Sequence, residues 1–470
     1  MRPNSWLQQQ AQLYPERPAF YWKDKSWSFA DLNLLVQKYA TYYQHELPEK
    51  TERVALFSEN SKEMYLTILA LWELGIEIQF LNTRLTTDEI QFQLADAQAQ
   101  VVIGRPLEVA LPYLAFPKEL PELFATAFID NGYQLDSIAS IMYTSGTTGK
   151  PKGVPQRFSN HRASALATQQ NMAIVPEDCW LCPTTLYHIS GLSVLLRSLV
   201  LGMSVRLYEK YDCQQIAQDI VEEKGTVISV VTKMLNELLD EVPECPNFRH
   251  FLLGGGPVPK SILERCAQKD WSVIQSFGMT ETCSQVIALP PERAIEKIGS
   301  AGLPLNNMEI KIQQGEVLLK GPNVVTEYLN NRGTDSWDKQ GWFHTGDLGY
   351  LDEEGFLFIQ SRMSELIISG GENIYPAEVE QAIVAHPKVK EAAVVGEEDE
   401  TWGQVPVAYL TLHQAMELSE LSECFDSLAR YKQPKRVYVV HDLPRTASGK
   451  PLKRKFLSEE RVNYIAYQLR

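Results

Sequence analysis

The sequence predicts an α/β protein with a large N-terminal domain of parallel and mixed sheets, flanking helices and a β-rich subdomain, and a small α+β C-terminal domain. From residue 53 onward, short apolar runs alternate with helical patterns, which is typical of parallel βαβ units. Beyond about residue 298, short alternating strands lie between Gly, Pro and Asn turns, and a further αβ unit begins near Ser364. The expected boundaries are a large domain at 1–361, its β-rich part at about 298–361, and a small domain at 366–470.

Local signals place the individual elements. An opening helix is expected within 4–45, and Ser28 with Asp31 predicts a capping box at the start of the next helix. Gly75 is expected to end a helix, and the segment 81–90 indicates a strand-to-helix connection with an N-cap Thr. The other predicted helices are 61–74, 160–171, 192–201, 213–224, 232–240, 259–269, 376–385 and 419–430. The predicted strands are 19–22, 53–57, 76–81, 101–103, 138–143, 179–182, 204–208, 227–230, 250–253, 272–276, 309–312, 316–320, 356–360, 391–395, 406–412 and 435–440.

Composition excludes several classes of protein. The net charge of −15 argues against non-specific nucleic-acid binding, which depends on neutralising phosphates. We find no apolar run of membrane-spanning length and no signal-peptide pattern, so we expect a cytoplasmic protein without an integral membrane segment; self-association is left open. Seven scattered cysteines fit a reducing compartment, and Cys179 and Cys182 are interpreted as core-facing thiols.

The residues 141–153 form the most informative stretch, Ile-Met-Tyr-Thr-Ser-Gly-Thr-Thr-Gly-Lys-Pro-Lys-Gly. A buried strand leads into a loop of hydroxyls, glycines and two lysines. Converging backbone N–H groups, hydroxyl donors and positive charge suit a polyphosphate. The spacing between Gly146 and Gly149 is too short for a Walker P-loop, so that class is disfavoured.

Two further stretches follow predicted strands and carry groups that suit a nucleotide. In Phe277-Gly278-Met279-Thr280-Glu281 the ring can stack on a base, Thr280 can donate to a phosphate and Glu281 can hold Mg²⁺. Gly254-Gly255-Gly256-Pro257 would let a ligand lie on bare backbone. Taken singly, these stretches also fit an ordinary helix start and a strand-to-helix turn.

Near the β-rich region, Thr345-Gly346-Asp347 places a carboxylate after a turn glycine, where it can accept ribose hydroxyls; the alternative is an Asp-stabilised turn. His188 stands in a loop that precedes an apolar helix, and a lone His is more often structural than catalytic. Close to the C-terminus, Ser448-Gly449-Lys450 precedes further basic residues and by default would be a solvated tail.

Together these stretches resemble the adenylate-forming superfamily of acyl-CoA ligases, firefly luciferase and peptide-synthetase adenylation domains. The loop at 144–153 matches its phosphate loop almost letter for letter, Phe277 replaces the usual Tyr of a Tyr-Gly-x-Thr-Glu pattern, and Thr446 to Lys450 matches its closing Thr-x-Ser-Gly-Lys. The resemblance spans essentially the full chain. It implies that a carboxylate attacks the α-phosphorus of ATP, with Mg²⁺ present, and that a thiol such as that of CoA attacks the resulting adenylate.

The resemblance also implies roles for individual residues. Lys450, Thr280 and His188 are the expected catalytic residues, with no proton transfer assigned to His188, which would gate the acyl site. Glu281 is expected to bind the metal, Ser364 to lie in a hinge at 362–365, about which a mobile C-terminal domain turns, and Gly370 and Gly371 to line the CoA route. The expected ATP-binding residues are Thr144, Ser145, Gly146, Thr147, Thr148, Lys152, Gly254, Gly255, Gly256, Phe277, Gly278, Thr280, Asp347, Arg362 and Lys450. The expected substrate-binding residues are His188, Ser193, Arg197, Gly255 and Gly278.

The acid substrate is indicated by one charge in an apolar helix. No acidic residue on 191–201 could hold an amino group, whereas Arg197 lies nine residues after His188. One interpretation is a helix-end Arg paired at the surface; the other is a counter-ion for a second carboxylate of the substrate. The stretches around Arg197 resemble the o-succinylbenzoate–CoA ligase family of menaquinone biosynthesis, whose substrate has two carboxylates.

Other functions stay open at this point. Another aryl- or acyl-CoA ligase would use the same steps and is favoured if Arg197 points to solvent. A non-catalytic nucleotide-binding protein is disfavoured by Lys450, Glu281 and Asp347 occurring together. A domain that loads a carrier protein is disfavoured because no carrier segment follows.

Overall fold

The computed structural model describes residues 4–120, 128–144, 151–255, 258–425, 428–445, 451–457 and 465–468. The chain forms two compact units. The first consists of Met1–Lys311, Leu318–His344 and Asp352–Leu357, and the second of Ile312–Val317, Thr345–Leu351 and Phe358–Arg470. The strands β16 (Glu309–Gln313), β17 (Glu316–Lys320), β18 (Phe343–Leu351) and β19 (Leu357–Arg362) lie where the chain passes between the two units.

The first unit contains two sheets. One has the strand order β6-β5-β3-β4-β7-β8 and is parallel except for the antiparallel pair β7–β8. The other includes the run β15-β14-β13-β12-β11-β9-β10-β1-β2, which is parallel from β13 to β1 and antiparallel at both ends. The strands are β1 (Pro18–Trp22), β2 (Lys25–Ser28), β3 (Arg53–Phe57), β4 (Glu77–Leu81), β5 (Val101–Gly104), β6 (Tyr113–Leu114), β7 (Ile138–Thr144), β8 (Lys152–Arg157), β9 (Cys179–Cys182), β10 (Ser204–Leu207), β11 (Val227–Val230), β12 (His250–Leu253), β13 (Val273–Met279), β14 (Ser284–Leu289) and β15 (Ser300–Pro304).

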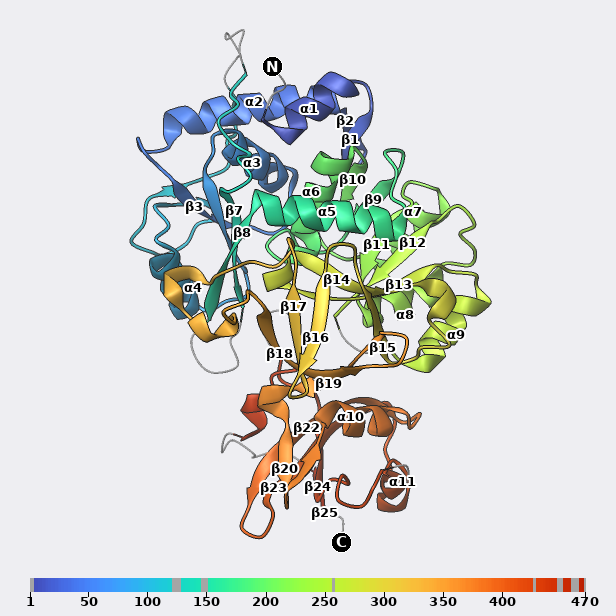
Figure 1. The fold of residues 1–470 in the computed structure, drawn as a ribbon. Coiled ribbons are helices and arrows are strands. Elements are labelled where there is room, and N and C mark those ends of the chain that lie inside the picture. The colour runs from blue at the N-terminus through green and yellow to red at the C-terminus, as the bar shows by residue number, and fades with distance from the viewer. Residues whose placement is uncertain are drawn as a thin grey trace. The chain divides into compact units, whose positions relative to one another are not determined.

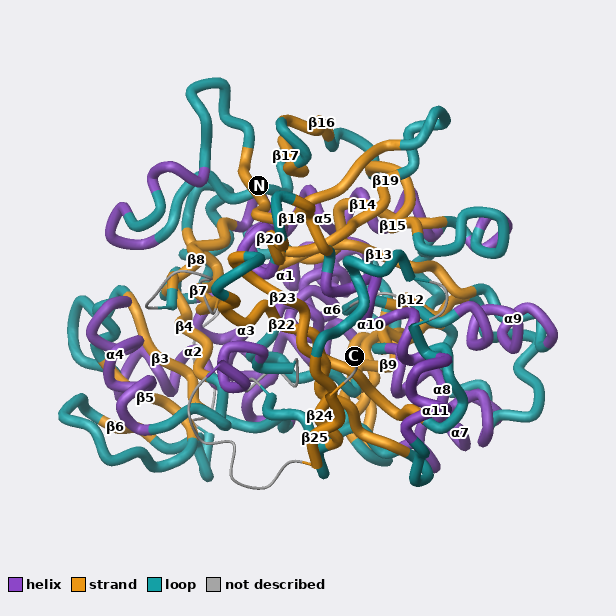
Figure 2. The backbone as a smooth tube through the Cα atoms, turned by 90° about the horizontal axis from the view of Figure 1, so that it is seen from below, coloured by secondary structure: helices purple, strands orange, loops and turns teal. Residues whose placement is uncertain are grey.

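Helices cover both sheets, and two of them pack between the sheets. Figure 1 shows α5 and α6 side by side between β3, β7 and β8 on one hand and β9, β11 and β12 on the other, an arrangement that Figure 2 shows from below. Of the two, α6 is the more apolar and is buried over nearly its whole length, whereas α5 also buries polar side chains such as His161 and Thr168. The helices of this unit are α1 (Trp6–Leu13), α2 (Phe29–Glu46), α3 (Lys62–Glu73), α4 (Thr87–Ala97), α5 (Phe158–Met172), α6 (Ile189–Leu201), α7 (Cys213–Val221), α8 (Thr232–Glu241) and α9 (Lys260–Gln268).

The second unit is built on a mixed sheet with the strand order β21-β20-β23-β24-β25, and β22 pairs with β23. Its apolar core lies between this sheet and two helices, with Val379, Leu410 and Phe425 among its buried residues. The elements are β20 (Ile367–Ser369), β21 (Glu372–Ile374), α10 (Pro376–Val384), β22 (Val389–Asp399), β23 (Gly403–Leu412), α11 (Leu418–Glu423), β24 (Arg436–Val439) and β25 (Ile465–Gln468).

Several local predictions are confirmed. Ser28 caps α2 through a capping box with Asp31, and Thr86 caps α4 in the same way. Gly75 has a φ of 75° directly after the end of α3, the left-handed conformation expected of a helix-stop glycine. All seven cysteines are free; of the two predicted core-facing thiols, Cys182 is buried and Cys179 is half-buried.

Other local predictions are wrong. Helix α6 begins at Ile189 instead of 192, because Leu192 N donates to His188 O at 3.0 Å and closes a first turn. The predicted helix 419–430 ends at Glu423. Strand β13 continues through Met279 instead of ending at 276. Thr345-Gly346-Asp347 lies inside β18, not in a turn, and β8 and β14 were not predicted. In each of these strands, glycine or polar residues interrupt the apolar alternation that predicts a strand. Pairing with a neighbouring strand nevertheless stabilises it.

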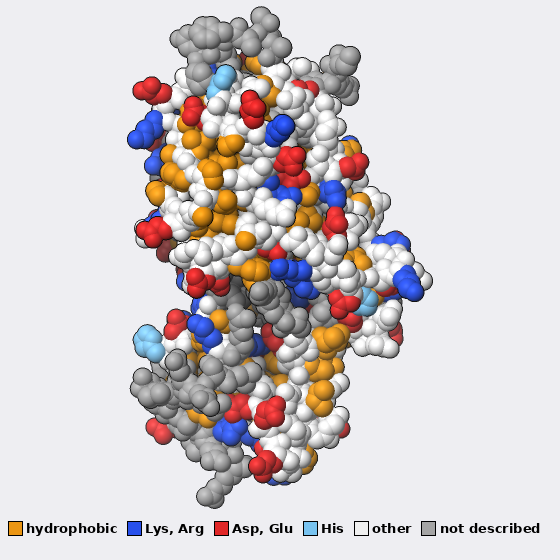
Figure 3. All heavy atoms as spheres, turned by 90° about the vertical axis from the view of Figure 1, so that its left-hand side faces the viewer, with side chains coloured by type: hydrophobic (Ala, Val, Ile, Leu, Met, Phe, Trp, Pro, Cys, Tyr) orange, Lys and Arg blue, Asp and Glu red, His pale blue; other side chains and the backbone are white. Residues whose placement is uncertain are grey.

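The surface carries both signs of charge. Figure 3 shows acidic and basic side chains interspersed over one face of the molecule, in keeping with the moderate net charge of −15. Among the described residues, no helix combines the length and the apolar character that crossing a membrane requires.

Candidate active site

The predicted phosphate loop joins two paired strands. β7 and β8 are antiparallel, and Thr144 faces Lys152 across the pair. The predicted phosphate-binding residues Ser145, Gly146, Thr147 and Thr148 lie outside the described residues. The two stems are buried along most of their length, so the ends of the loop are fixed by the sheet.

The stretch after Ser276 positions its residues differently from the prediction. Phe277 and Gly278 are part of β13, and Thr280 and Glu281 form a 3₁₀ turn (Thr280–Thr282) that leads into β14. A Cβ on Gly278 would overlap the carbonyl oxygen of Ser284. The glycine is therefore required by the close approach of two strands, in addition to any ligand.

Glu281 is the acidic group of this site. It is 7% exposed, and its Oε1 accepts hydrogen bonds from Thr144 Oγ1 at 3.4 Å and Tyr328 Oη at 2.9 Å. Within the described residues it forms no salt bridge. A buried carboxylate without a cationic neighbour is the donor that Mg²⁺ takes together with phosphate oxygens, so the residues present fit the predicted metal.

Lys152 begins β8, where its ammonium group is held over an aromatic ring. Its Nζ lies 4.7 Å from the centroid of the Tyr328 ring. A Cβ on Gly333 would lie 2.6 Å from this Nζ and 3.2 Å from Tyr328 Cδ2, so the backbone at Gly333 packs close to both groups. The structure thus brings Thr144, Lys152 and Glu281 around Tyr328.

The glycines after β12 lie next to β11 and β13. Gly254 N donates to Val230 O at 3.1 Å, and Gly255 adopts a φ of 101°, which disfavours any other residue. Among the described residues, a Cβ at Gly254 would meet Ser276 Oγ at 3.5 Å and no other heavy atom within 4 Å. Gly256, also predicted to bind ATP, lies outside the described residues.

His188 occupies the N-cap position of α6, the helix that carries the predicted substrate residues. Its Nε2 lies 3.5 Å from Nδ2 of Asn82, which makes Nε2 the acceptor. Asn60 holds the preceding loop: its Nδ2 donates to Thr184 O and its Oδ1 accepts from Leu186 N. Asn82 therefore contacts His188 directly and Asn60 fixes the loop before it; neither asparagine was predicted to do so.

Arg197 is buried instead of lying at the surface, so the surface interpretation is wrong. It is 1% exposed, its guanidinium stacks over Trp180 at 4.7 Å, and Nη2 donates to Ser284 Oγ at 2.9 Å. Within the described residues, Nε and Nη1 have no hydrogen-bond partner. Burial lowers the pKa of Arg197 to about 9, partly opposed by Cys182, so it is still a cation at neutral pH. Ser193, one helical turn earlier, is also buried.

Asp347 and Arg362 meet in the second unit. Nε of Arg362 lies 2.8 Å from Oδ1 of Asp347, and Nη1 of Arg362 donates to Thr345 O. The hydroxyl of Thr345 donates to Val317 O and accepts from Asp347 N, which fixes this part of β18. The two residues predicted to contact the ribose are thus neighbours.

The residues predicted for the hinge and the CoA route also belong to the second unit. Ser364 is exposed in a 3₁₀ turn (Met363–Glu365), and Gly370 and Gly371 form the two-residue turn of the β20–β21 hairpin with φ of 58° and 89°. Positive φ at both positions is what such a tight hairpin needs. Lys450 lies outside the described residues. Beyond it, Lys453 is held by Glu365 at 2.6 Å and Glu380 at 2.9 Å.

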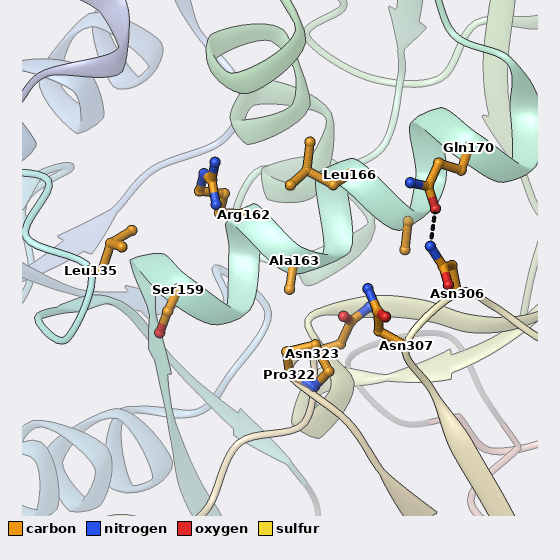
Figure 4. A pocket seen from close by; sticks show the side chains of 11 residues that line it. Leu135, Ser159, Arg162, Ala163, Leu166, Gln170, Asn306, Asn307, Pro322 and Asn323 are labelled. Carbon is orange, nitrogen blue, oxygen red and sulfur yellow. Dashed lines mark hydrogen bonds between the residues drawn. The ribbon is translucent and has the colours of Figure 1, made fainter.

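The sequence did not predict the residues that contact the site from distant positions in the chain. Tyr328 and Ser284 contact predicted site residues, but neither stands in a recognisable pattern. A pocket of about 310 Å³ lies elsewhere, between α5 and the segments 306–307 and 322–323, where Asn306 donates to Gln170 (Figure 4). None of the predicted site residues lines it, so we assign it no role in this site.

Comparison with known proteins gives matches over nearly the whole chain. Residues 7–329 match the family model described as AMP-binding enzyme, and 378–450 match the AMP-binding enzyme C-terminal domain. The 2-succinylbenzoate–CoA ligase of Enterococcus faecalis is 52% identical over 482 residues, with 98% of this chain and 99% of that one covered.

Solved structures are similar throughout. O-succinylbenzoate CoA synthetase (MenE) from Bacillus subtilis, in complex with the acyl-adenylate intermediate OSB-AMP, matches with a TM-score of 0.91 at 42% identity, covering 97% of this chain and 98% of that one. The same enzyme with ATP and a magnesium ion matches with a TM-score of 0.90 at 42% identity, covering 96% and 99%. These matches confirm the predicted fold class.

Proposed function

The chain belongs to the AMP-binding enzyme family. We propose that it is an ATP-dependent 2-succinylbenzoate–CoA ligase acting in menaquinone biosynthesis. Its relatives of that name and the Bacillus subtilis complexes support both the reaction and the use of ATP, Mg²⁺ and CoA. The proposed location is the cytoplasm, where ATP and CoA are available together.

Buried Arg197 is the observation that carries the choice of acid. A cation in an apolar helix costs free energy unless an anion or a polar partner compensates it. Two of its three nitrogens have no hydrogen-bond partner among the described residues, and they lie on the helix that His188 caps. A second carboxylate on the substrate would supply both the charge and the acceptors, whereas a fatty acid or benzoate would not.

The first half-reaction forms the mixed anhydride. A carboxylate oxygen of the succinyl group attacks the α-phosphorus of ATP, a P–O bond forms, and the bond to the bridging oxygen breaks as pyrophosphate leaves. This step depends mainly on position and on neutralised charge. Glu281 would hold Mg²⁺, which would neutralise part of the charge on the phosphates. Lys152 and Thr280 would donate to the phosphate oxygens. We propose that Lys450 stabilises the charge that develops between carboxylate and phosphate.

The second half-reaction forms the thioester. The CoA thiol loses its proton, the thiolate sulfur attacks the carbonyl carbon of the adenylate, a C–S bond forms, and the C–O bond breaks as AMP leaves with its phosphate oxygen. We propose that Gly370 and Gly371 line the CoA route, that Asp347 and Arg362 bind the ribose, and that a hinge at Ser364 lets the small domain turn between the two steps. A hinge needs tolerant backbone angles more than a particular side chain, and Ser364 is exposed in a short turn.

The test is pyrophosphate release by the purified protein with ATP and Mg²⁺, together with CoA thioester formation. The acids offered are 2-succinylbenzoate, benzoate, octanoate and a set of amino acids, with Lys450→Ala as the variant expected to lose the first half-reaction, by about 10²–10³ in rate. Strong selectivity for 2-succinylbenzoate is expected. Equal use of benzoate would remove the substrate assignment and leave a general acyl-CoA ligase; no release with any acid would favour a non-catalytic nucleotide-binding protein.

A further inference from the structure

The segment Val325 to Arg332, which we call the brace, contacts Glu281 twice. Val325 N donates to the backbone oxygen of Glu281 at 2.9 Å, and Tyr328 Oη donates to its side-chain Oε1 at 2.9 Å. Tyr328 is 6% exposed, so water does not compete for this hydrogen bond. Both the backbone and the carboxylate of the predicted metal ligand are therefore held by one segment.

The brace also contacts the second stem of the phosphate loop at three successive residues. Arg332 Nη1 donates to Pro151 O at 3.2 Å, and the Tyr328 ring lies under Lys152 Nζ at 4.7 Å. A Cβ on Gly153 would lie 2.8 Å from Leu329 Cδ1, so the brace packs directly on that backbone. One side chain, Tyr328, thus contacts both the carboxylate and the lysine.

Surrounding contacts fix Tyr328 in this position. Trp337 packs against its ring at 5.1 Å and donates from Nε1 to Val325 O at 2.9 Å. Arg332 forms a salt bridge with Asp96, whose side chain is 4% exposed. The hydroxyl of Tyr328 is therefore presented to Glu281 by a rigid arrangement.

We propose that Tyr328 is a positioning residue for Mg–ATP, acting through Glu281 and Lys152. Its hydroxyl orients the Glu281 carboxylate for the metal. Its ring holds the lysine ammonium, and among the described residues no salt bridge joins Lys152 to Glu281. Each charge is then available to the ligand instead of being neutralised by the other. The inference rests on the proposed function, because that function supplies Mg–ATP as the ligand.

The experiment is calorimetric ATP binding to the full-length protein over a series of Mg²⁺ concentrations. In Tyr328→Phe, we expect the Mg²⁺ concentration for half-maximal binding to rise about tenfold, the lower end of the effect of removing a partner of a metal ligand. ATP binding without Mg²⁺ is expected to be unchanged. Tyr328→Leu also removes the ring and should weaken metal-free ATP binding about fivefold.

The matched control is Tyr211→Phe, which removes a hydroxyl that donates to Met234 O at 3.2 Å in the same unit. It should keep the wild-type Mg²⁺ dependence. A Tyr328→Phe titration that superimposes on the wild type would overturn the proposal, and so would a lower Tm with an unchanged Mg²⁺ dependence, since that is a purely structural role. If wild-type protein binds Mg–ATP but releases no pyrophosphate with any acid, the proposed function fails while this test still decides on Tyr328. A wild-type protein that binds no Mg–ATP would overturn both.

Discussion

Replacing Arg197 by Met is expected to weaken use of 2-succinylbenzoate and, at the same time, to stabilise the free protein. Methionine has similar length and no charge, so it fills the space over Trp180 without creating a large cavity. The guanidinium makes one hydrogen bond, to Ser284, and its other two nitrogens have no partner among the described residues. A guanidinium with two unpaired nitrogens can bind a ligand carboxylate, but it contributes little to the stability of the fold.

The size of both effects follows from these contacts. Hydrogen bonds that involve a charged group contribute about 1.5–3 kcal/mol each. Two bonds to one carboxylate do not add fully, so a loss of about 3 kcal/mol is expected, roughly 100-fold in kcat/KM. Burial lowers the pKa of Arg197 to about 9, which means that the folded protein disfavours the charge. Removing it should raise the free energy of unfolding by about 1–2 kcal/mol.

The assay compares two acids and two variants. Pyrophosphate release is measured with 2-succinylbenzoate and with benzoylpropionate, the same acid without the ring carboxylate, and unfolding is followed in urea. The control is Arg206→Met, because Arg206 also stacks on a ring at 4.7 Å, that of Tyr21, in the same unit. Arg197→Met should lose the discrimination between the acids, and the control should keep it.

The reasoning fails if Arg197→Met reduces activity equally with both acids, or if it destabilises the protein by as much as a lost packing contact would. Either result would make Arg197 a structural residue that supports Trp180 and β14. The substrate assignment would then rest on the similarity to relatives alone.

Three other predictions concern stability. Burial raises the pKa of Glu73 to about 8, with a contribution from Asp130 and despite hydrogen bonds from Ser5 and Gln8, so the native state holds a proton that the unfolded state has lost. The free energy of unfolding should therefore fall between about pH 5 and 8, by up to about 1.4 kcal/mol per pH unit. Urea titrations of Glu73→Gln should show a flatter pH dependence than those of the wild type. Gly278→Ala should cost about 2–3 kcal/mol, because the new Cβ overlaps a backbone oxygen of β14, and an unchanged urea midpoint would contradict this. Lys453→Met leaves Glu365 and Glu380 without their shared cation, and thermal unfolding should show a lower Tm, with a partial return in the variant that also carries Glu365→Gln.

Residues that act through local chemistry could be predicted from the sequence. The capping residue Ser28, the helix-stop Gly75 and the strand that leads to Thr144 each depend on neighbours within a few positions, and all three are confirmed. Predicted boundaries were wrong where long-range pairing decides. β13 extends through Gly278 because β14 pairs with it, and no local pattern signals that partner.

The sequence by itself determined the fold class, the alternation of strands and helices, and the set of groups able to handle a nucleotide and an acid, because these follow from residue type and spacing. Only the tertiary structure decided that Arg197 is buried, that Tyr328 joins Glu281 to Lys152, and that Asn82 reaches His188. These contacts join residues from about 50 to more than 170 positions apart, as counted along the printed sequence. Burial and hydrogen-bond partners at such separations are set by which sheets and helices pack together, and a periodic pattern within one element carries no information about that packing.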